Sequence, residues 1–179
     1  MVDPGSGPFL FDTSAESLLA RAHSSWMREY LARHQLHTSA VTVLERSRGF
    51  SLLYRGAAQN RKESIEALRV AWLRGLGRVW PVDEAVAAVA GEIMTLLPDP
   101  PTPPRRSHQL AESRADRLSR WRFDCMIAAT ALVARLPIIH NNAADFEAIR
   151  SAIERYPYRF PDLGPLELIR CQRLQPKVH

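Results

Sequence analysis

Short apolar runs alternate along the chain with longer stretches in which apolar residues recur at helical spacing. The short runs predict buried strands over residues 9–11, 38–42, 79–82, 136–139 and 166–170. Strands that alternate with amphipathic helices are typical of a parallel sheet covered by helices on both faces. We therefore expect a three-layer α/β/α sandwich with a mostly parallel sheet of four to five short strands.

The longer stretches predict the helices that cover this sheet. We expect helices over residues 14–30, 64–73, 105–122, 124–135 and 146–155, one that carries Glu45, and one that follows Asp83 as its N-cap. Residues 55–62 are polar and basic and are expected to separate two of these helices. Five prolines among residues 98–104 predict a rigid, extended link.

The length of 179 residues fits one domain with a sizeable core. We expect residues 1–8 to be a flexible leader and residues 9–179 to form a single domain. No stretch approaches the roughly 18 apolar residues of a membrane helix, and no signal peptide is recognisable. Together with only two cysteines, Cys125 and Cys171, this predicts a cytoplasmic protein with reduced thiols.

The net charge of +5, carried almost entirely by arginine, favours a polyanionic partner. Arginine makes planar, two-pronged contacts with phosphate. The arginines that could contact RNA are Arg105, Arg106, Arg117, Arg120 and Arg122. The alternative is a solvated helix face on which arginines alternate with acids. Trp121 could stack on a base or pack in the core.

Four acidic residues stand beside apolar segments, where a charge is costly to bury. They are Asp12, Glu45, Asp124 and Asp145. Asp12 and Asp145 follow predicted strands, and ligands of parallel sheets bind beyond the carboxyl ends of the strands. Asp124 is expected at the start of its helix, where the helix dipole favours a negative charge. Each acid alone fits a helix cap or a solvated position, but the four together suggest one shared cation.

Four segments of the chain resemble the motifs of the PIN domain family, in the family's order and with approximately its spacing. They are residues 9–14, 38–45, 123–131 and 141–146. The resemblance extends from residue 9 to the last predicted strand. In size and single-domain layout, the chain is most similar to the VapC-type toxins of bacterial toxin–antitoxin pairs.

The resemblance implies an endoribonuclease that depends on Mg²⁺ or Mn²⁺. It places Asp12, Glu45, Asp124 and Asp145 in an acidic pocket, supported by Asn142 and by the hydroxyl of Thr13 or Ser14. We expect Asp12 and Asp124 to bind the principal metal, directly or through water. Asp145 and Glu45 would complete the shell, bind a second ion, or orient the attacking water. The family also implies a homodimer, and an antitoxin whose C-terminal segment blocks the pocket.

Three features depart from the family pattern. His140 stands where the family usually has a small hydroxyl residue, and Arg122 where many members have a further acid. The insertion before the third motif, residues 98–122, is longer than usual. Two alternatives to a toxin remain open: a PIN nuclease that processes RNA, and a PIN-like binding module without catalysis. Retention of all four acids argues against the second alternative.

Overall fold

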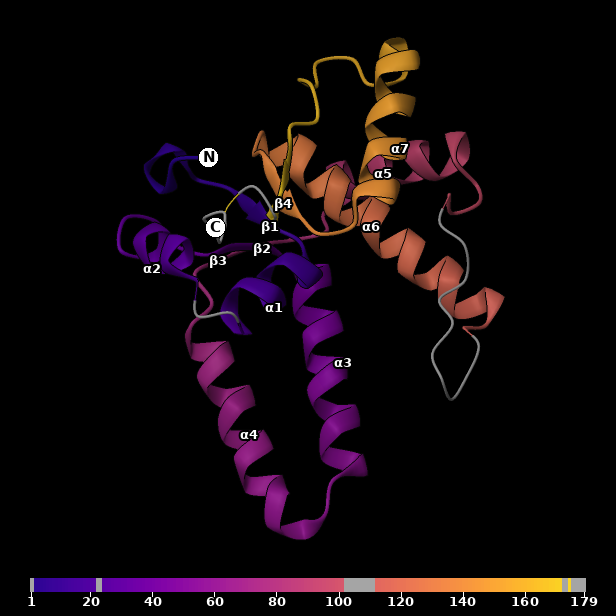
Figure 1. The fold of residues 1–179 in the computed structure, drawn as a ribbon. Coiled ribbons are helices and arrows are strands. Elements are labelled where there is room, and N and C mark those ends of the chain that lie inside the picture. Colours follow the sequence, from indigo (N-terminus) through magenta and orange to yellow (C-terminus); the bar gives the residue numbers. More distant parts are fainter. Residues whose placement is uncertain (1, 22–23, 102–111, 172–173, 175–179) are drawn as a thin grey trace, which may run out of the picture.

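The sheet of this protein is entirely parallel. A computed structural model describes residues 2–21, 24–101, 112–171 and 174. Its strands are β1 (Leu10–Phe11), β2 (His37–Ser39), β3 (Arg78–Trp80), β4 (Ile138–His140) and β5 (Leu168–Arg170), in the spatial order β3-β2-β1-β4-β5. The predicted α/β sandwich with a parallel sheet is confirmed (Figure 1).

Helices connect the strands and cover both faces of the sheet. They are α1 (Thr13–Arg21), α2 (Ser25–Leu31), α3 (Ala40–Gly56), α4 (Gln59–Arg74), α5 (Glu84–Leu96), α6 (Arg114–Ala134) and α7 (Ala143–Arg155), with 3-10 turns at Pro4–Ser6 and Pro157–Arg159. The side chain of Asp83 accepts a hydrogen bond from the backbone N–H of Val86, so the predicted N-cap of α5 is present. None of the helices in the described ranges is both long and apolar enough to cross a membrane.

The hydrophobic core has two parts, one on each face of the sheet. Successive side chains of a strand point to opposite faces of the sheet. Leu10 and Ile138 therefore pack with α5, α6 and α7, whereas Phe11 and Ile139 pack with α1 and α2. All four side chains are fully buried. Burial on both faces is expected of a parallel sheet and explains why these strands are continuous apolar runs.

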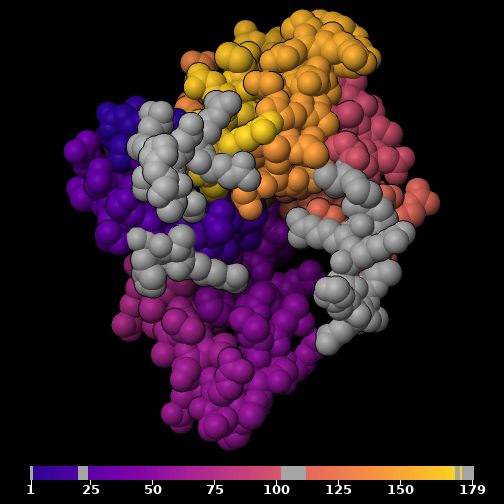
Figure 2. Space-filling model, in the orientation of Figure 1, coloured from indigo at the N-terminus to yellow at the C-terminus, as the bar shows by residue number. Residues whose placement is uncertain are grey.

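The helices α3 and α4 form a hairpin that projects from the sheet (Figures 1 and 2). The prediction that residues 55–62 separate two helices was wrong in extent, because α3 runs to Gly56 and α4 begins at Gln59. Arginine, lysine and glutamine are good helix formers, so a polar, basic segment needs no break. The hairpin exposes large apolar side chains: Leu44, Leu52, Leu53, Tyr54, Leu68 and Leu73.

Two further helix boundaries differ from those predicted. The expected single helix over residues 14–30 is two helices, and Ser24 caps the second by accepting a hydrogen bond from the N–H of Met27. The two helices expected on either side of residue 123 are one, α6, which begins after its N-cap Ser113. No glycine or proline interrupts residues 114–134, so nothing in the sequence ends the first helix before Asp124.

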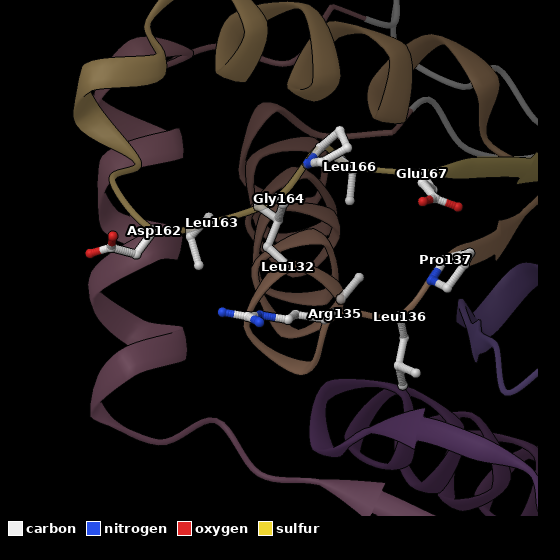
Figure 3. Close-up of a pocket in the computed structure, with 11 residues that line it drawn as sticks. Leu132, Arg135, Leu136, Pro137, Asp162, Leu163, Gly164, Leu166 and Glu167 are labelled. Carbon is white, nitrogen blue, oxygen red and sulfur yellow. The ribbon is translucent and has the colours of Figure 1, made fainter.

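A cavity of about 490 Å³ lies at the amino-terminal ends of β4 and β5. The end of α6 and the loop before β5 line it, with apolar side chains such as Leu132 and Leu166 (Figure 3). The charged residues Asp162 and Glu167 stand at opposite ends of this loop in the view of Figure 3. The predicted acidic residues lie at the opposite ends of the strands, the carboxyl ends.

Candidate active site

The sheet changes its winding direction between β1 and β4. From β1 the chain adds β2 and β3 on one side, whereas β4 and β5 extend the sheet on the other side. Ligand sites of parallel sheets form at such switch points, beyond the carboxyl ends of the strands. Asp12 directly follows β1, and Asn141 and Asn142 directly follow β4. The topology alone therefore brings the first and fourth motifs to one place.

Asp12 is buried at this point, with 3% of its surface exposed. Its carboxylate accepts hydrogen bonds from the Ser14 hydroxyl at 2.8 Å and from the Ala15 N–H at 2.6 Å, so it also caps α1. Burial raises the pKa of Asp12 from 3.8 to about 6, and the negative charge of Glu45 adds to this shift. These hydrogen bonds, and an interaction with the backbone of Asn141, oppose the shift because they favour the charged form. Asp12 is thus a fixed carboxylate that lacks a countercharge.

Asp124 lies inside α6, ten positions after Arg114, and not at a helix start as expected from the sequence. Its pKa is raised well above 3.8, first by burial and then by the charges of Asp145, Asp12 and Glu45. The amide of Asn142 donates hydrogen bonds to Asp124 at 3.0 Å and to Asp145 at 2.5 Å. One amide therefore joins the carboxylates of α6 and α7.

Glu45 extends the cluster toward α3. The hydroxyl of Thr13 donates to the Glu45 carboxylate at 2.5 Å and lies 3.3 Å from the hydroxyl of Thr42. Thr13 therefore connects the first turn of α1 to α3. The structure brings together the predicted site residues Asp12, Thr13, Ser14, Glu45, Asp124, Asn142 and Asp145 through these hydrogen bonds and mutual charges.

A comparison with known proteins identifies the family of this arrangement. The family model described as the PIN domain matches residues 9–151. The chain belongs to the PIN domain family. Among curated proteins, none matches the sequence.

Solved structures share the PIN fold at low sequence identity. The structure of FitAcB from Neisseria gonorrhoeae is similar to this chain with a TM-score of 0.58 and 22% identity, over 93% of this chain and 100% of that one. VapBC2 from Rickettsia felis, bound to a DNA fragment from its promoter, gives 0.56 and 16%, over 90% and 97%. DNA-bound VapBC from Salmonella typhimurium gives 0.57 and 17%, over 91% and 97%. The resemblance to VapC-type proteins is thus confirmed in the fold.

The donor atoms of the acidic cluster suit a divalent cation, but they do not form a complete coordination shell. Its donors are carboxylate, amide and hydroxyl oxygens, which suit Mg²⁺ or Mn²⁺. Within the described ranges, no three His, Cys, Asp or Glu side chains are already arranged to ligate one ion. Mg²⁺ commonly keeps several waters and uses only one or two carboxylates, so a partly open arrangement of Asp12 and Asp124 fits this ion.

The three predicted RNA-binding arginines that the structure describes, Arg117, Arg120 and Arg122, differ in exposure and contacts. Arg105 and Arg106 lie outside the described residues. Arg122 is exposed, Arg117 is half-buried, and Arg120 is held by Glu112 through two hydrogen bonds of 3.1 and 2.9 Å. Of the alternatives for Trp121, packing in the core is the one found, because this side chain is buried and its indole N–H donates to the carbonyl of Leu97.

Two charged residues near the site, Glu16 and Arg46, were not predicted from the sequence. Glu16 is buried on α1 and pairs with Arg46 of α3 at 3.1 Å. The Arg46 guanidinium lies 5.3 Å and 5.4 Å from the ring centres of Phe50 and Trp72. Arg46 directly follows Glu45, and Glu16 follows Asp12 by one helical turn. This spacing could have suggested a pair, but only the packing of α1 on α3 shows it.

His140 occupies the position of the usual small hydroxyl residue at the end of β4. The side chain is fully buried, and neither ring nitrogen makes a hydrogen bond of ordinary geometry to a described residue. Burial and, next, the charge of Arg170 lower the pKa of His140 to about 4. His140 therefore lies at the strand end without a described hydrogen bond of ordinary geometry from its ring nitrogens.

Proposed function

We propose that this PIN protein is a metal-dependent endoribonuclease and the toxin of a type II toxin–antitoxin pair. The observation that carries the proposal is the burial of Asp12 and Asp124 beside Glu45 and Asp145 at the switch point of the sheet. Neither Asp12 nor Asp124 forms an ion pair with a basic side chain in the part of the chain that the structure describes. A cation from outside is the simplest way to compensate these charges.

Each site residue has a separate role in the proposed reaction. Asp12 and Asp124 would hold the metal, and when bound the metal supplies an activated water and stabilises the leaving oxygen. Ser14 and the N–H of Ala15 fix the orientation of the Asp12 carboxylate. Asn142 fixes Asp124 relative to Asp145, leaving Asp145 to complete the shell or accept a proton from the attacking water.

RNA is the proposed substrate because the chain carries a net charge of +5 although its centre is acidic. Positive charge around a metal-binding pocket attracts a polyanion to the place where the metal neutralises a phosphate. Hydrolysis of a phosphodiester needs this neutralisation together with a water held in line with the phosphorus.

An antitoxin is the proposed protein partner. Two solved structures with the same fold, from Rickettsia felis and Salmonella typhimurium, are of VapBC bound to DNA, and the resemblance of this chain to VapC-type toxins implies an antitoxin partner. The hairpin of α3 and α4 carries six of the exposed large apolar side chains of the described residues, and such patches mark protein interfaces. The antitoxin's C-terminal segment would cover this hairpin and the neighbouring pocket, and a homodimer would cover other exposed surface.

The test is to map RNA ends in cells after induction of the wild type beside Asp124→Asn. We expect growth arrest and new RNA ends with the wild type alone, and relief of both when a cognate antitoxin is co-expressed. New ends without growth arrest or antitoxin relief would favour an RNA-processing nuclease. New ends in both strains would contradict the proposed site, and their absence in both would favour a binding module.

A further inference from the structure

A groove opens directly beside the acidic cluster, between α3 and the beginning of α6. Its volume is about 530 Å³, and six of its lining residues are charged or aromatic: Glu45, Arg48, Glu112, Asp116, Arg120 and Phe123. The volume falls within the range of small-ligand sites. Since Glu45 belongs to both the groove and the acidic cluster, a molecule that lies in the groove reaches the cluster.

The groove combines the two features that bind single-stranded nucleic acid. The guanidinium groups of Arg48 and Arg120 suit phosphate oxygens, and the ring of Phe123 suits a base. Phe123 directly precedes Asp124 on α6, so the aromatic ring and the proposed metal ligand belong to the same helical turn. Arg48 lies one turn beyond Glu45 on α3.

The two arginines differ in what they contact. Arg48 is exposed and forms no ion pair with any described residue. Arg120 is mostly buried and makes a two-pronged pair with the carboxylate of Glu112. A phosphate presents the same pair of oxygens to a guanidinium as a carboxylate does. Glu112 therefore occupies the position that a phosphate would take on Arg120.

We propose that this groove holds the RNA nucleotide next to the scissile phosphate, with Phe123 against its base and Arg48 and Arg120 on its phosphate. The inference rests on the proposed nuclease function and adds the path of the substrate. RNA fits better than a peptide because the two walls of the groove together offer two guanidinium groups and an aromatic ring beside the proposed cation site, with Arg48 on α3 and Arg120 and Phe123 on α6. The groove also contains the carboxylates of Glu45, Glu112 and Asp116. The bound metal would compensate part of this negative charge, and the phosphate would replace Glu112 on Arg120.

The test measures binding of a short, fluorescein-labelled single-stranded RNA by anisotropy over a series of salt concentrations. Ca²⁺ replaces Mg²⁺ so that the RNA stays intact. Arg48→Gln should weaken binding about fivefold and reduce the salt dependence by one phosphate contact, about 0.7 in the log–log slope. Arg48→Lys should keep the slope. The matched control is Arg55→Gln, which removes an exposed arginine of the same helix outside the groove.

Two other variants separate the base contact from the phosphate contacts. Phe123→Leu should weaken binding about tenfold, as expected for a lost stacking partner, without a change in the salt slope. Glu112→Gln should tighten binding about threefold, because it releases Arg120 to the RNA. The melting temperature of each variant shows whether it remains folded, and Arg48→Gln leaves the described contacts unchanged.

Equal affinity and equal salt slope for Arg48→Gln and Arg55→Gln would overturn the groove proposal. If the wild type still cleaves RNA with Mg²⁺, the proposed function stands and only the groove fails. If the wild type neither binds nor cleaves RNA, both fail. If Arg48→Gln and Glu112→Gln change only the affinity for the co-expressed antitoxin, the groove receives protein and the RNA assignment is wrong.

Discussion

Two buried carboxylates one helical turn apart, Asp12 at the cap of α1 and Glu16 within it, have different charge partners. Glu16 donates its backbone N–H to the carbonyl of Asp12, and both residues are 3% exposed. The Glu16 carboxylate faces Arg46, which packs against two aromatic rings. The Asp12 carboxylate faces a hydroxyl, a backbone N–H and, further away, the negative charge of Glu45.

The difference separates a structural acid from one that serves a ligand. A buried ion pair compensates its own charges, and Glu16 has Arg46 as its partner. Hydrogen bonds from neutral donors compensate only part of the cost of burying Asp12, and its raised pKa measures the remainder. Asp124 repeats this situation on α6. Among the described residues, the fold thus leaves Asp12 and Asp124 without a basic partner and pairs Glu16 with Arg46.

The strongest test of this contrast is RNA cleavage by Asp12→Asn beside Glu16→Gln. The first substitution removes a proposed metal ligand and should lower the cleavage rate at least about a thousandfold, in the range lost when a key electrostatic group is removed. The second should retain the rate within about threefold at temperatures where it is folded, because Glu16 contacts Arg46 and not the metal site. The measurement is cleavage of total RNA with Mg²⁺. A folded Asp12→Asn protein with full activity would contradict the proposed role.

The metal-free protein should lose stability as the pH rises. Asp12 has a pKa of about 6 in the folded chain and an ordinary value of 3.8, so between these values the folded state binds more protons than the unfolded state. The free energy of unfolding therefore falls with rising pH, by about 3 kcal/mol for Asp12 over the window from about 4 to 6. Asp124 acts in the same direction.

Urea denaturation in EDTA at several pH values measures this dependence. Asp12→Asn should flatten the curve, since asparagine does not titrate in this range. Glu16→Gln should keep the slope of the wild type. A wild-type protein whose stability rises between pH 4 and pH 6 would show that the buried acids are compensated within the chain.

The sequence predicted the sheet and the acidic residues because both depend on local patterns. Strands buried on both faces must be continuous apolar runs, and a parallel sheet collects the residues that follow its strands at one edge. Asp12 and Asn142 were predictable in this way. Asp124 was found by its motif but misplaced, because helix formers on both sides of it leave no local sign that α6 continues.

The compensation of each charge could not be predicted, since it depends on packing between distant segments. The pair of Glu16 and Arg46 forms only because α1 lies against α3. The groove beside Glu45 likewise forms only because the first turns of α6 face α3. From the sequence, Glu112 and Arg120 could belong to a solvated face of alternating charges, but in the fold they form a mostly buried pair beside the site.

Breaking the compensated pair should cost stability and not activity. Glu16→Gln leaves Arg46 partly buried without its carboxylate and should lower the free energy of unfolding by about 2 kcal/mol. The measurement is urea denaturation at pH 7. Glu29→Gln is the matched control, because Glu29 is an exposed acid on the neighbouring helix α2 and should change stability by less than about 0.5 kcal/mol. Equal effects of the two substitutions would mean that the buried pair contributes no more than surface charge.

The smallest expected effect is also the most direct comparison of the two kinds of carboxylate. Mg²⁺ that binds only the folded state at ten times its dissociation constant should stabilise the wild type by about 1.4 kcal/mol. Asp124→Asn should lose most of this gain, yet in EDTA it should be as stable as the wild type or more so, because it removes a repelled buried charge. Glu16→Gln should keep the gain although its starting stability is lower. Thermal melts with and without Mg²⁺, at constant ionic strength set by NaCl, measure all three. A gain that depends on Glu16 as much as on Asp124 would mean that the metal screens charge over the whole protein and does not occupy the acidic cluster.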